Sequence, residues 1–286
     1  MPGKGWPYGN FTTSAEPLYC TADHCAQIYR MLDAASGRIV AYGWVINYRQ
    51  LSIKLSNDAT PPASGDLAEV EPGPAPGKDT ATLRATVYDA SNQPQPGVSV
   101  TLRAEAVSQS GGHSHHDDNR PMGDLGGTLP LGHILENQVT GPDGAVHFTF
   151  KAPKVAGDHK ITATCTGGKT CKQEGPDKVW VGIQGLVSLY DTHLYRLVGS
   201  DGVHPNNHYL TIGATGSVVW LAELYRARFP SDPVLHLNDA SLERGGLFDI
   251  QYRGRFQWWT PPHEEHRRGT VIDVRANEAP GAIPAG

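Results

Sequence analysis

The sequence predicts a mainly β protein, with a β-sandwich in the middle of the chain and a smaller α+β domain after it. Two observations predict this fold class. Glycine and proline, with 33 and 22 residues, make up 55 of the 286 residues, a share of about 19% that is typical of many turns rather than of long helices. Short segments in which apolar and polar residues alternate fill the middle of the chain, and this period of two is the pattern of half-buried strands.

The charge balance argues against a nucleic-acid partner. The chain has 24 Lys and Arg residues against 29 Asp and Glu residues, a net charge of −5, and no run of basic residues is longer than two. Binding to a phosphate backbone requires a concentrated basic surface, so we expect no nucleic acid among the partners. No segment approaches the roughly 20 apolar residues of a membrane-spanning helix, so we expect no membrane span.

Two features bear on the compartment of the protein, and they point in opposite directions. The start, Met1–Pro7, lacks the apolar core of a secretion signal, so no signal peptide is expected in this chain. The four cysteines form two local pairs, Cys20 with Cys25 and Cys165 with Cys171, each spaced for a small loop that a disulfide could close. We expect disulfides, and therefore an exported protein that is periplasmic or extracellular in its native context.

Residues 1–60 form an N-terminal segment to which no role is assigned. Within it, Ala26–Ala35 is compatible with a short helix, and Ile39–Leu55 alternates as strands do. Residues 61–77 are rich in proline and glycine, as in the run from Glu71 to Gly77. Such a density of these residues is typical of a semi-rigid linker or an exposed loop.

Residues 78–183 are expected to form the β-sandwich, because short alternating strands are separated by turn signals. The predicted strands are Thr82–Tyr88, Val98–Ala104, Ala145–Phe150, Lys160–Cys165 and Val179–Ile183. Three segments, Ala85–Val100, Gly141–Val146 and Ala156–Ala163, resemble bacterial Ig-like modules of the invasin type. That resemblance implies an Ig-like sandwich that serves as a spacer or an adhesion module rather than in catalysis.

Residues 184–286 are expected to form the α+β domain. Ser217–Arg228 has apolar residues at helical spacing, with Ser217 as a candidate N-cap and basic residues in the last turn. Three segments after it are predicted as strands: Leu235–Asn238, Leu247–Ile250 and Val271–Val274. Most of the candidate chemistry lies in this part of the chain.

A histidine and a carboxylate in this domain suggest a metal site. His266 and Asp273 are seven residues apart, across a glycine turn that leads into a predicted strand, so both can point into one cleft. Imidazole and carboxylate suit Zn²⁺, and a catalytic zinc commonly has three protein ligands and one open position for water. The metal lowers the pKa of that water to about 7, so that hydroxide can attack a carbonyl. The alternative for such a spacing is a charged surface loop.

The surrounding sequence favours the metal site. The segment from His266 to Asp273 matches the pattern H-x-x-G-x-x-x-D, and His263 lies three residues before it. Here the chain resembles the penicillin-insensitive murein endopeptidases, within the wider lysostaphin and D-Ala-D-Ala metallopeptidase group. The resemblance implies that His266 and Asp273 bind zinc and that His263 lies at the site. Glu264 and Glu265 stand where the family often has Ala and Ser, and either could compete for the metal or serve as a base. His263, Glu264 and Glu265 are therefore the candidate catalytic residues.

The resemblance covers roughly residues 204–277. The family completes its site with a later H-x-H motif, and no histidine follows His266 in this chain. We therefore expect either a truncated domain or a third ligand that comes from elsewhere. His208, in a polar turn, and Asp249, after two glycines, are further candidate ligands.

A second candidate metal cluster lies within the predicted sandwich. Its residues follow two glycines and are His113, His115, His116, Asp117 and Asp118. Their imidazole nitrogens suit Zn²⁺, and their carboxylate oxygens suit Ca²⁺. A solvated loop between two strands would carry the same residues.

Three functions follow from these patterns. The first is a metal-dependent hydrolase, by resemblance an amidase or endopeptidase that acts on cell-wall peptides through a metal-bound hydroxide. The second is a metal-dependent hydrolase of small esters or lactones such as N-acyl-homoserine lactones, whose leaving groups need less protonation. The third is a non-enzymatic Ig-like binding or spacer module that carries an inert remnant of a hydrolase.

Overall fold

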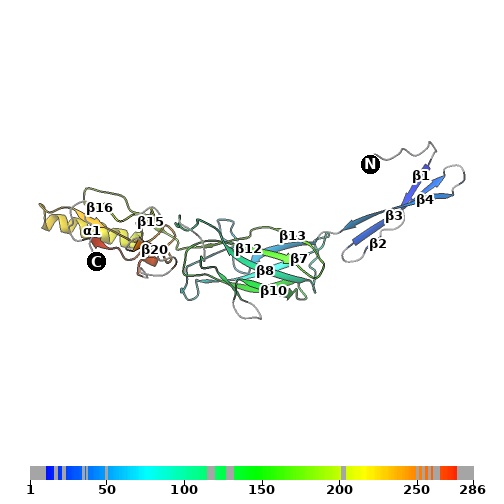
Figure 1. The fold of residues 1–286 in the computed structure, drawn as a ribbon, viewed down its shortest axis with the longest axis horizontal. Helices are drawn as coiled ribbons and strands as arrows, with labels where there is room; N and C mark the ends of the chain where they lie inside the picture. The colour runs from blue at the N-terminus through cyan, green and yellow to red at the C-terminus, as the bar shows by residue number, and fades with distance from the viewer. Residues whose placement is uncertain are drawn as a thin grey trace.

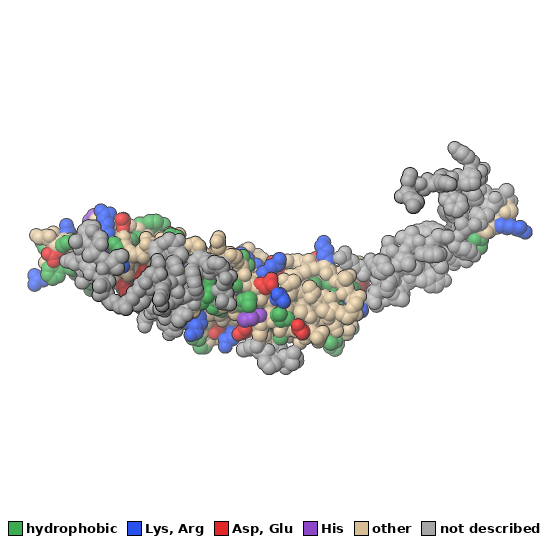
Figure 2. All heavy atoms as spheres, in the orientation of Figure 1, with side chains coloured by type: hydrophobic (Ala, Val, Ile, Leu, Met, Phe, Trp, Pro, Cys, Tyr) green, Lys and Arg blue, Asp and Glu red, His purple; other side chains and the backbone are tan. Residues whose placement is uncertain are grey.

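The computed structural model describes residues 51–114, 120–126, 132–200, 204–248 and 265–275, the strands between residues 11 and 48, two short strands between 251 and 256, and a few single residues. Before residue 51, and for the two short strands, the description is almost entirely of the backbone. A small N-terminal sheet, a β-sandwich and a C-terminal unit follow one another along the chain. In Figure 1 the sandwich lies in the middle of an elongated molecule, with the N-terminal sheet at one end and the C-terminal unit at the other. Figure 2, in the same orientation, shows charged side chains of both signs on the visible face of the sandwich.

The N-terminal sheet consists of antiparallel strands around one long strand. Its strands are β1 (Phe11–Ala15), β2 (Tyr19–Cys20), β3 (His24–Asp33) and β4 (Ile39–Tyr48), and β3 pairs with the other three. The predicted helix at Ala26–Ala35 is therefore wrong, because pairing with β4 along almost all of β3 overrides the weak local preference for a helix. The strands predicted in Ile39–Leu55 are confirmed as β4 and the start of the next strand.

Two sheets of five strands each form the sandwich. Its strands are β5 (Leu51–Asn57), β6 (Ala68–Val70), β7 (Thr80–Tyr88), β8 (Ser99–Ala106), β9 (Asp124–Gly126), β10 (Ile134–Val139), β11 (Ala145–Lys151), β12 (Gly157–Cys165), β13 (Cys171–Glu174) and β14 (Lys178–Val181). The order is β13–β5–β7–β11–β9 in the first sheet and β10–β8–β12–β14–β6 in the second. Neighbouring strands are antiparallel except in the pairs β5–β13 and β6–β14. The mainly β prediction and the predicted sandwich are confirmed.

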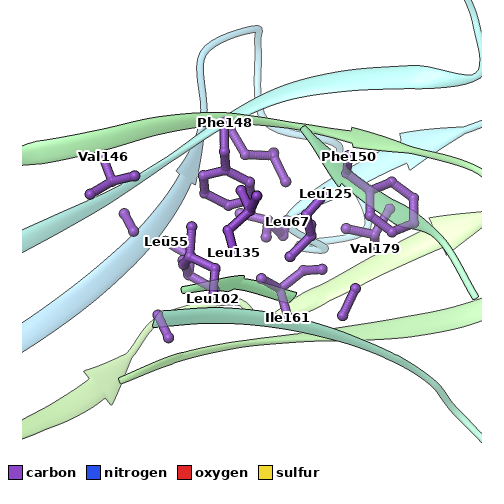
Figure 3. Packing of buried hydrophobic residues seen from close by; sticks show 14 of the residues in the cluster. Leu55, Leu67, Leu102, Leu125, Leu135, Val146, Phe148, Phe150, Ile161 and Val179 are labelled. Carbon is purple, nitrogen blue, oxygen red and sulfur yellow. The ribbon is translucent and has the colours of Figure 1, made fainter. Parts of the chain in front are cut away.

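Alternation along the strands produces the core between the two sheets. In β7, Leu83 and Val87 are fully buried, whereas Arg84 between them is exposed. Opposite them, Leu102 of β8 and Ile161 of β12 are also fully buried, and Figure 3 shows both in the layer between the sheets. Because burial of one such side chain contributes about 1.5–3 kcal/mol, this core dominates the stability of the sandwich.

The sandwich begins earlier in the chain than the predicted boundary at residue 78. β5 pairs with β7 in the first sheet and β6 pairs with β14 in the second, so residues 58–67 cross from one sheet to the other. The proline- and glycine-rich residues 61–77 run along the sandwich instead of joining two domains. Ala75 is buried, for example, and its N–H donates to the carboxylate of Asp79 at 3.1 Å.

A disulfide joins Cys165, the last residue of β12, to Cys171, the first residue of β13. Because β12 and β13 belong to different sheets, the bridge ties the two sheets together. Both cysteines pack against the core. One predicted pair is thus confirmed, whereas Cys20 and Cys25 are register partners in β2 and β3 whose side chains lie outside the described part of the chain.

The C-terminal unit consists of short strands and one α-helix in its described residues. Its elements are β15 (Leu186–Ser188), β16 (Tyr195–Leu197), β17 (Tyr209–Thr211), α1 (Ile212–Arg228), β18 (Leu235–Leu237), β19 (Gln251–Tyr252), β20 (Arg255–Phe256), the 3-10 turn η1 (Glu265–Arg268) and β21 (Val274–Arg275). β15 pairs with β17, β19 pairs with β20, and β18 lies between β16 and β21. A small core that includes Leu210, Val218 and Leu237 holds α1 against these strands.

Helix α1 begins five residues before the predicted start at Ser217. Its N-cap is Thr211, whose hydroxyl accepts a hydrogen bond from Ala214 N at 3.2 Å, while the Ser217 hydroxyl donates to Gly213 O within the helix. The strand predicted at Leu235–Asn238 is confirmed as β18. Of the other two predicted strands, the described Leu247 and Phe248 lie outside any strand, and only Val274 falls in β21.

Replacing Cys165 and Cys171 together by alanine should lower the free energy of unfolding by about 2 kcal/mol, because the bridge closes only a short loop and loop-closure entropy grows slowly with length. Denaturant unfolding of the two proteins measures this difference. A reductant should weaken the original protein by at least this amount and the double variant by less, since the variant retains only the pair Cys20 and Cys25. An unchanged midpoint for the double variant would show that the bridge does not stabilise the sandwich.

Candidate functional site

Backbone hydrogen bonds join the sandwich to the C-terminal unit. Leu247 N donates to Lys154 O at 2.8 Å, and Ile183 N donates to Arg244 O at 2.9 Å. Val155 and Gly246 form an antiparallel bridge beside them. We call the contact between residues 154–158 and residues 244–247 the junction.

Glycine allows the close approach of the two segments at the junction. Gly246 has φ +78°, a conformation that other residues rarely adopt. A Cβ atom there would lie 2.5 Å from Ala156 N and 3.0 Å from its Cβ. Within the sandwich, Gly111 also has a positive φ of +77°, and a Cβ atom on it would collide with Ala156 O. Ala156 is therefore enclosed by two glycine turns from distant parts of the sequence.

A buried arginine fastens the loop after β8 to the same place. Arg120 is only 6% exposed, and its guanidinium donates to Val107 O at 3.2 Å, Ser110 O at 2.9 Å and Ala156 O at 2.8 Å. A buried charge is tolerated only when it is hydrogen-bonded. Arg120 therefore fixes residues 107–110 against the start of β12.

A second arginine connects the two units nearer to the surface. Arg244 Nη1 lies 2.6 Å from Asp158 Oδ1, and the side chains of both residues are less than one quarter exposed. The guanidinium also lies 5.5 Å from the centre of the Trp180 ring. Arg244, Asp158 and Trp180 thus come from the C-terminal unit, β12 and β14, and together they cover one side of the junction.

Two histidine rings pack against each other between the loop after β8 of the sandwich and the C-terminal unit. The ring centres of His113 and His204 are 5.5 Å apart, with the rings almost perpendicular. The centre of the Trp259 ring lies 5.1 Å from that of His113, and the centre of the Phe248 ring lies 5.5 Å from that of His204. Both histidines are at least 98% buried. Edge-to-face pairs of this kind contribute about 0.5–1.5 kcal/mol each beyond the burial of their area, so these imidazoles help to hold the two units together.

The predicted ligands His208 and His266 are also buried, and each donates a hydrogen bond to the backbone. His208 Nε2 donates to Val198 O at 2.9 Å, and His266 Nδ1 donates to Val271 O at 3.3 Å. His266 Nε2 lies 3.5 Å from Asp273 Oδ2. The structure therefore brings together the pair His266 and Asp273, as the sequence predicts, with the imidazole buried and the carboxylate half exposed.

The described residues form no larger group of metal ligands. Among them, no three His, Cys, Asp or Glu side chains are placed to hold one ion. Several predicted site residues lie outside the described residues: Asp249, His263, Glu264, His115, His116, Asp117 and Asp118. Glu265 is in η1, but its side chain is not described. Zn²⁺ and Ca²⁺ binding by these residues stays a prediction.

A further buried histidine lies in the sandwich, beside the junction. His159 of β12 is 1% exposed, and its ring centre lies 5.4 Å from that of Phe150. Burial, followed by the nearby positive charge of Arg120, lowers the pKa of His159 from 6.5 to about 4. His159 is therefore neutral at physiological pH, as its apolar surroundings require.

A groove of about 870 Å³ opens at the end of the sandwich that faces the C-terminal unit; we call it the end groove. Its sides are formed by the end of β5, the start of β7, strand β6 and the end of β14. The residues that line it are Asn57, Asp58, Ala59, Glu69, Val70, Glu71, Gly77, Lys78, Thr80, Ala81, Thr82, Trp180, Gly182 and Gln184. Arg268 of η1 reaches this wall and lies 3.0 Å from Glu71.

Neither the end groove nor the role of Arg120 is predicted by the residue patterns. One signal was present for Trp180, because its neighbours in β14, Val179 and Val181, are apolar and buried, which places the indole on the outer face of the sheet. The remaining lining residues come from segments that are far apart in the sequence. No local pattern could have brought them together.

Comparison with known proteins gives limited similarity. No protein-family model matches the chain, and no curated protein matches it. A similar solved structure is the adhesin InvE of Yersinia pseudotuberculosis, with 11% identity and a TM-score of 0.32, where the match covers 63% of this chain and 50% of InvE. Another is the Escherichia coli adhesin FdeC, with 13% identity and a TM-score of 0.28, covering 64% and 56%. The chain thus spans about half the length of each adhesin.

The prediction of a murein endopeptidase-like domain, and of a hydrolase acting on peptides, is wrong. The two solved structures named above are adhesins by name, and among the described residues no three His, Cys, Asp or Glu side chains are placed to hold one ion. The lactone hydrolase depends on the same metal and has no support. The physical reason is that the H-x6-D spacing sets only two side chains close together.

No described helix is long and apolar enough to cross a membrane.

The sandwich should lose stability on acidification because of His159. Its unfolded-state pKa is near 6.5 and its folded-state pKa is about 4, so the unfolded chain binds the extra proton between these values. The contribution of His159 to the free energy of unfolding is complete above about pH 6.5 and is lost as the pH falls towards 4. The total loss is about 3 kcal/mol. Denaturant unfolding of the original protein and of His159→Phe at several pH values measures it, with a steeper decline expected for the original.

The matched control for this effect is His147→Gln. The exposed His147 has a raised pKa because it hydrogen-bonds to Asp143, so its removal should change the slope in the opposite direction. Parallel stability curves for the original protein and His159→Phe between pH 6.5 and 4 would contradict the assignment.

Replacing Gly246 by valine should separate the C-terminal unit from the sandwich. The added side chain meets Ala156 directly, and such overpacking costs about 1–3 kcal/mol in addition to the strain of a positive φ. Gly65→Val is the control, since Gly65 has φ +80° with nothing within 4 Å of an added Cβ. Limited proteolysis should cut residues 183–247 faster in Gly246→Val alone. Equal cutting rates in both variants would contradict a rigid junction.

Proposed function

We propose that the chain is a non-enzymatic Ig-like binding module of an exported, adhesin-type protein. The observation that carries this proposal is the use of the histidines from which the sequence suggested catalysis. His113 stacks with other rings, and His208 and His266 donate hydrogen bonds to backbone carbonyls. In this proposal the buried imidazoles serve to hold the fold together.

The construction of the sandwich supports a role outside the cell. A disulfide ties its two sheets together, and such bonds persist in oxidising compartments. InvE and FdeC are adhesins by name, and we carry that function over to this chain as part of the proposal. An adhesin needs a body that keeps its shape while it presents a surface, and the junction provides this by enclosing Ala156 between two glycine turns.

The purified chain, labelled with a fluorophore, should bind to the surface of cultured epithelial cells in a saturable manner, because a folded surface of fixed shape offers a limited number of partner contacts. Flow cytometry over a range of concentrations measures the binding. The control is Leu102→Asp, which places an unpaired charge in the fully buried core and should unfold the sandwich. Binding that does not saturate, or that is equal for the control, would contradict an adhesive function.

A further inference from the structure

The end groove has the size and fixed geometry of a ligand site. Its volume of about 870 Å³ lies within the range of roughly 300–1,000 Å³ that is usual for small-molecule sites. The buried side chains of Val70 and Ala81 lie at its base, and exposed polar residues stand around them. These residues are on strands of both sheets, so the groove is held by the sandwich itself.

Trp180, the only aromatic side chain among the described residues that line the groove, is held in place from outside it. The six-membered ring of Trp180 packs on Gly182, where a Cβ would not fit, and Arg244 lies over the indole. Trp180 lines the groove and Arg244 does not, so the groove meets a part of the indole that Arg244 leaves uncovered. A fixed aromatic surface can bind the apolar face of a ligand ring at a low entropic cost.

The charges of the groove disfavour ionic ligands. Asp58, Glu69 and Glu71 give it an excess of negative charge over Lys78, which opposes an anionic ligand. Two of these carboxylates already have cationic partners, since Lys78 lies 2.8 Å and Arg268 3.0 Å from Glu71, and Arg84 lies 3.5 Å from Asp58. A cationic peptide would have to displace these partners.

Neutral hydroxyl groups fit the polar groups that remain. Glu69 accepts one hydrogen bond at each oxygen, from Ser64 at 2.8 Å and from Gln184 at 2.9 Å, and each carboxylate oxygen has a further lone pair. Asn57 Oδ1 accepts from Ala59 N at 2.9 Å, which leaves its amide N–H groups to donate. The hydroxyl of Thr82, on the exposed face of β7, can both donate and accept.

We infer that the end groove binds a neutral oligosaccharide. Each sugar ring has an apolar face that suits Trp180 and a rim of hydroxyls that suits Glu69, Gln184 and Asn57. This inference rests on the proposed adhesive function and specifies its ligand as a surface glycan without charge.

The test uses the whole chain on an array of immobilised neutral and sialylated oligosaccharides, with a heptalysine peptide as a third probe. The chain should bind at least one neutral oligosaccharide and neither charged class, and titration calorimetry gives its affinity. Thr82→Arg, which fills the groove from an exposed position, should weaken that affinity by about tenfold or more. Thr164→Arg, an exposed threonine on the other sheet, is the matched control and should bind as the original does.

Three results would overturn the inference: no binding to any neutral oligosaccharide, stronger binding to heptalysine than to the oligosaccharides, or equal affinity of Thr82→Arg and the original protein. The thermal midpoint of Thr82→Arg should equal that of Thr164→Arg, so a loss of binding reports the groove and not unfolding. If Thr82→Arg still binds epithelial cells as the original does, the adhesive function stands and the groove is not its site. If the original protein fails on cells as well, both proposals fall.

Discussion

The buried guanidinium of Arg120 is the constraint on which the relation between the sandwich and the C-terminal unit depends. A charge that is 94% buried must have acceptors, and the three carbonyls that it finds belong to Val107, Ser110 and Ala156. This satisfies the charge and at the same time sets the backbone around Ala156 in one position. Gly246 can then lie against that backbone without a side chain in between, and the remaining contacts of the junction follow from this approach.

The sandwich supplies the stiffness that this arrangement needs. Its core is closed because β5 and β6, which are neighbours in the sequence, lie in different sheets, and the segment between them covers one end. That same crossing forms the end groove, since Asn57 and Glu69 come from its two sides. A packed core below and a backbone crossing above make a groove whose shape does not depend on a ligand, which is the condition for recognition at a low entropic cost.

The histidines show how a residue type can suggest chemistry and yet serve structure. Imidazole is flat, partly apolar and able to donate a single hydrogen bond, so it packs well where a ring must also satisfy one carbonyl. His208 and His266 each donate a hydrogen bond to a backbone carbonyl. His159 packs beside Phe150, and its burial keeps it neutral at physiological pH. The burial of His159 makes the sandwich sensitive to acid beside the junction.

Residue patterns alone predict the mainly β class, most strands of the sandwich, the disulfide between Cys165 and Cys171, and the proximity of His266 to Asp273. These features depend on alternation, short spacing or neighbouring residues, which are local properties of the chain. The same patterns wrongly predicted a helix at β3, placed the start of the sandwich too late in the chain, and suggested a hydrolase from two side chains. In contrast, the contact of His113 with His204, and the groove that Thr82, Glu69 and Trp180 line, exist only in the folded protein. Such contacts join segments far apart in the chain, and they are set by which strands pair across the two sheets, a choice that no local pattern of residues encodes.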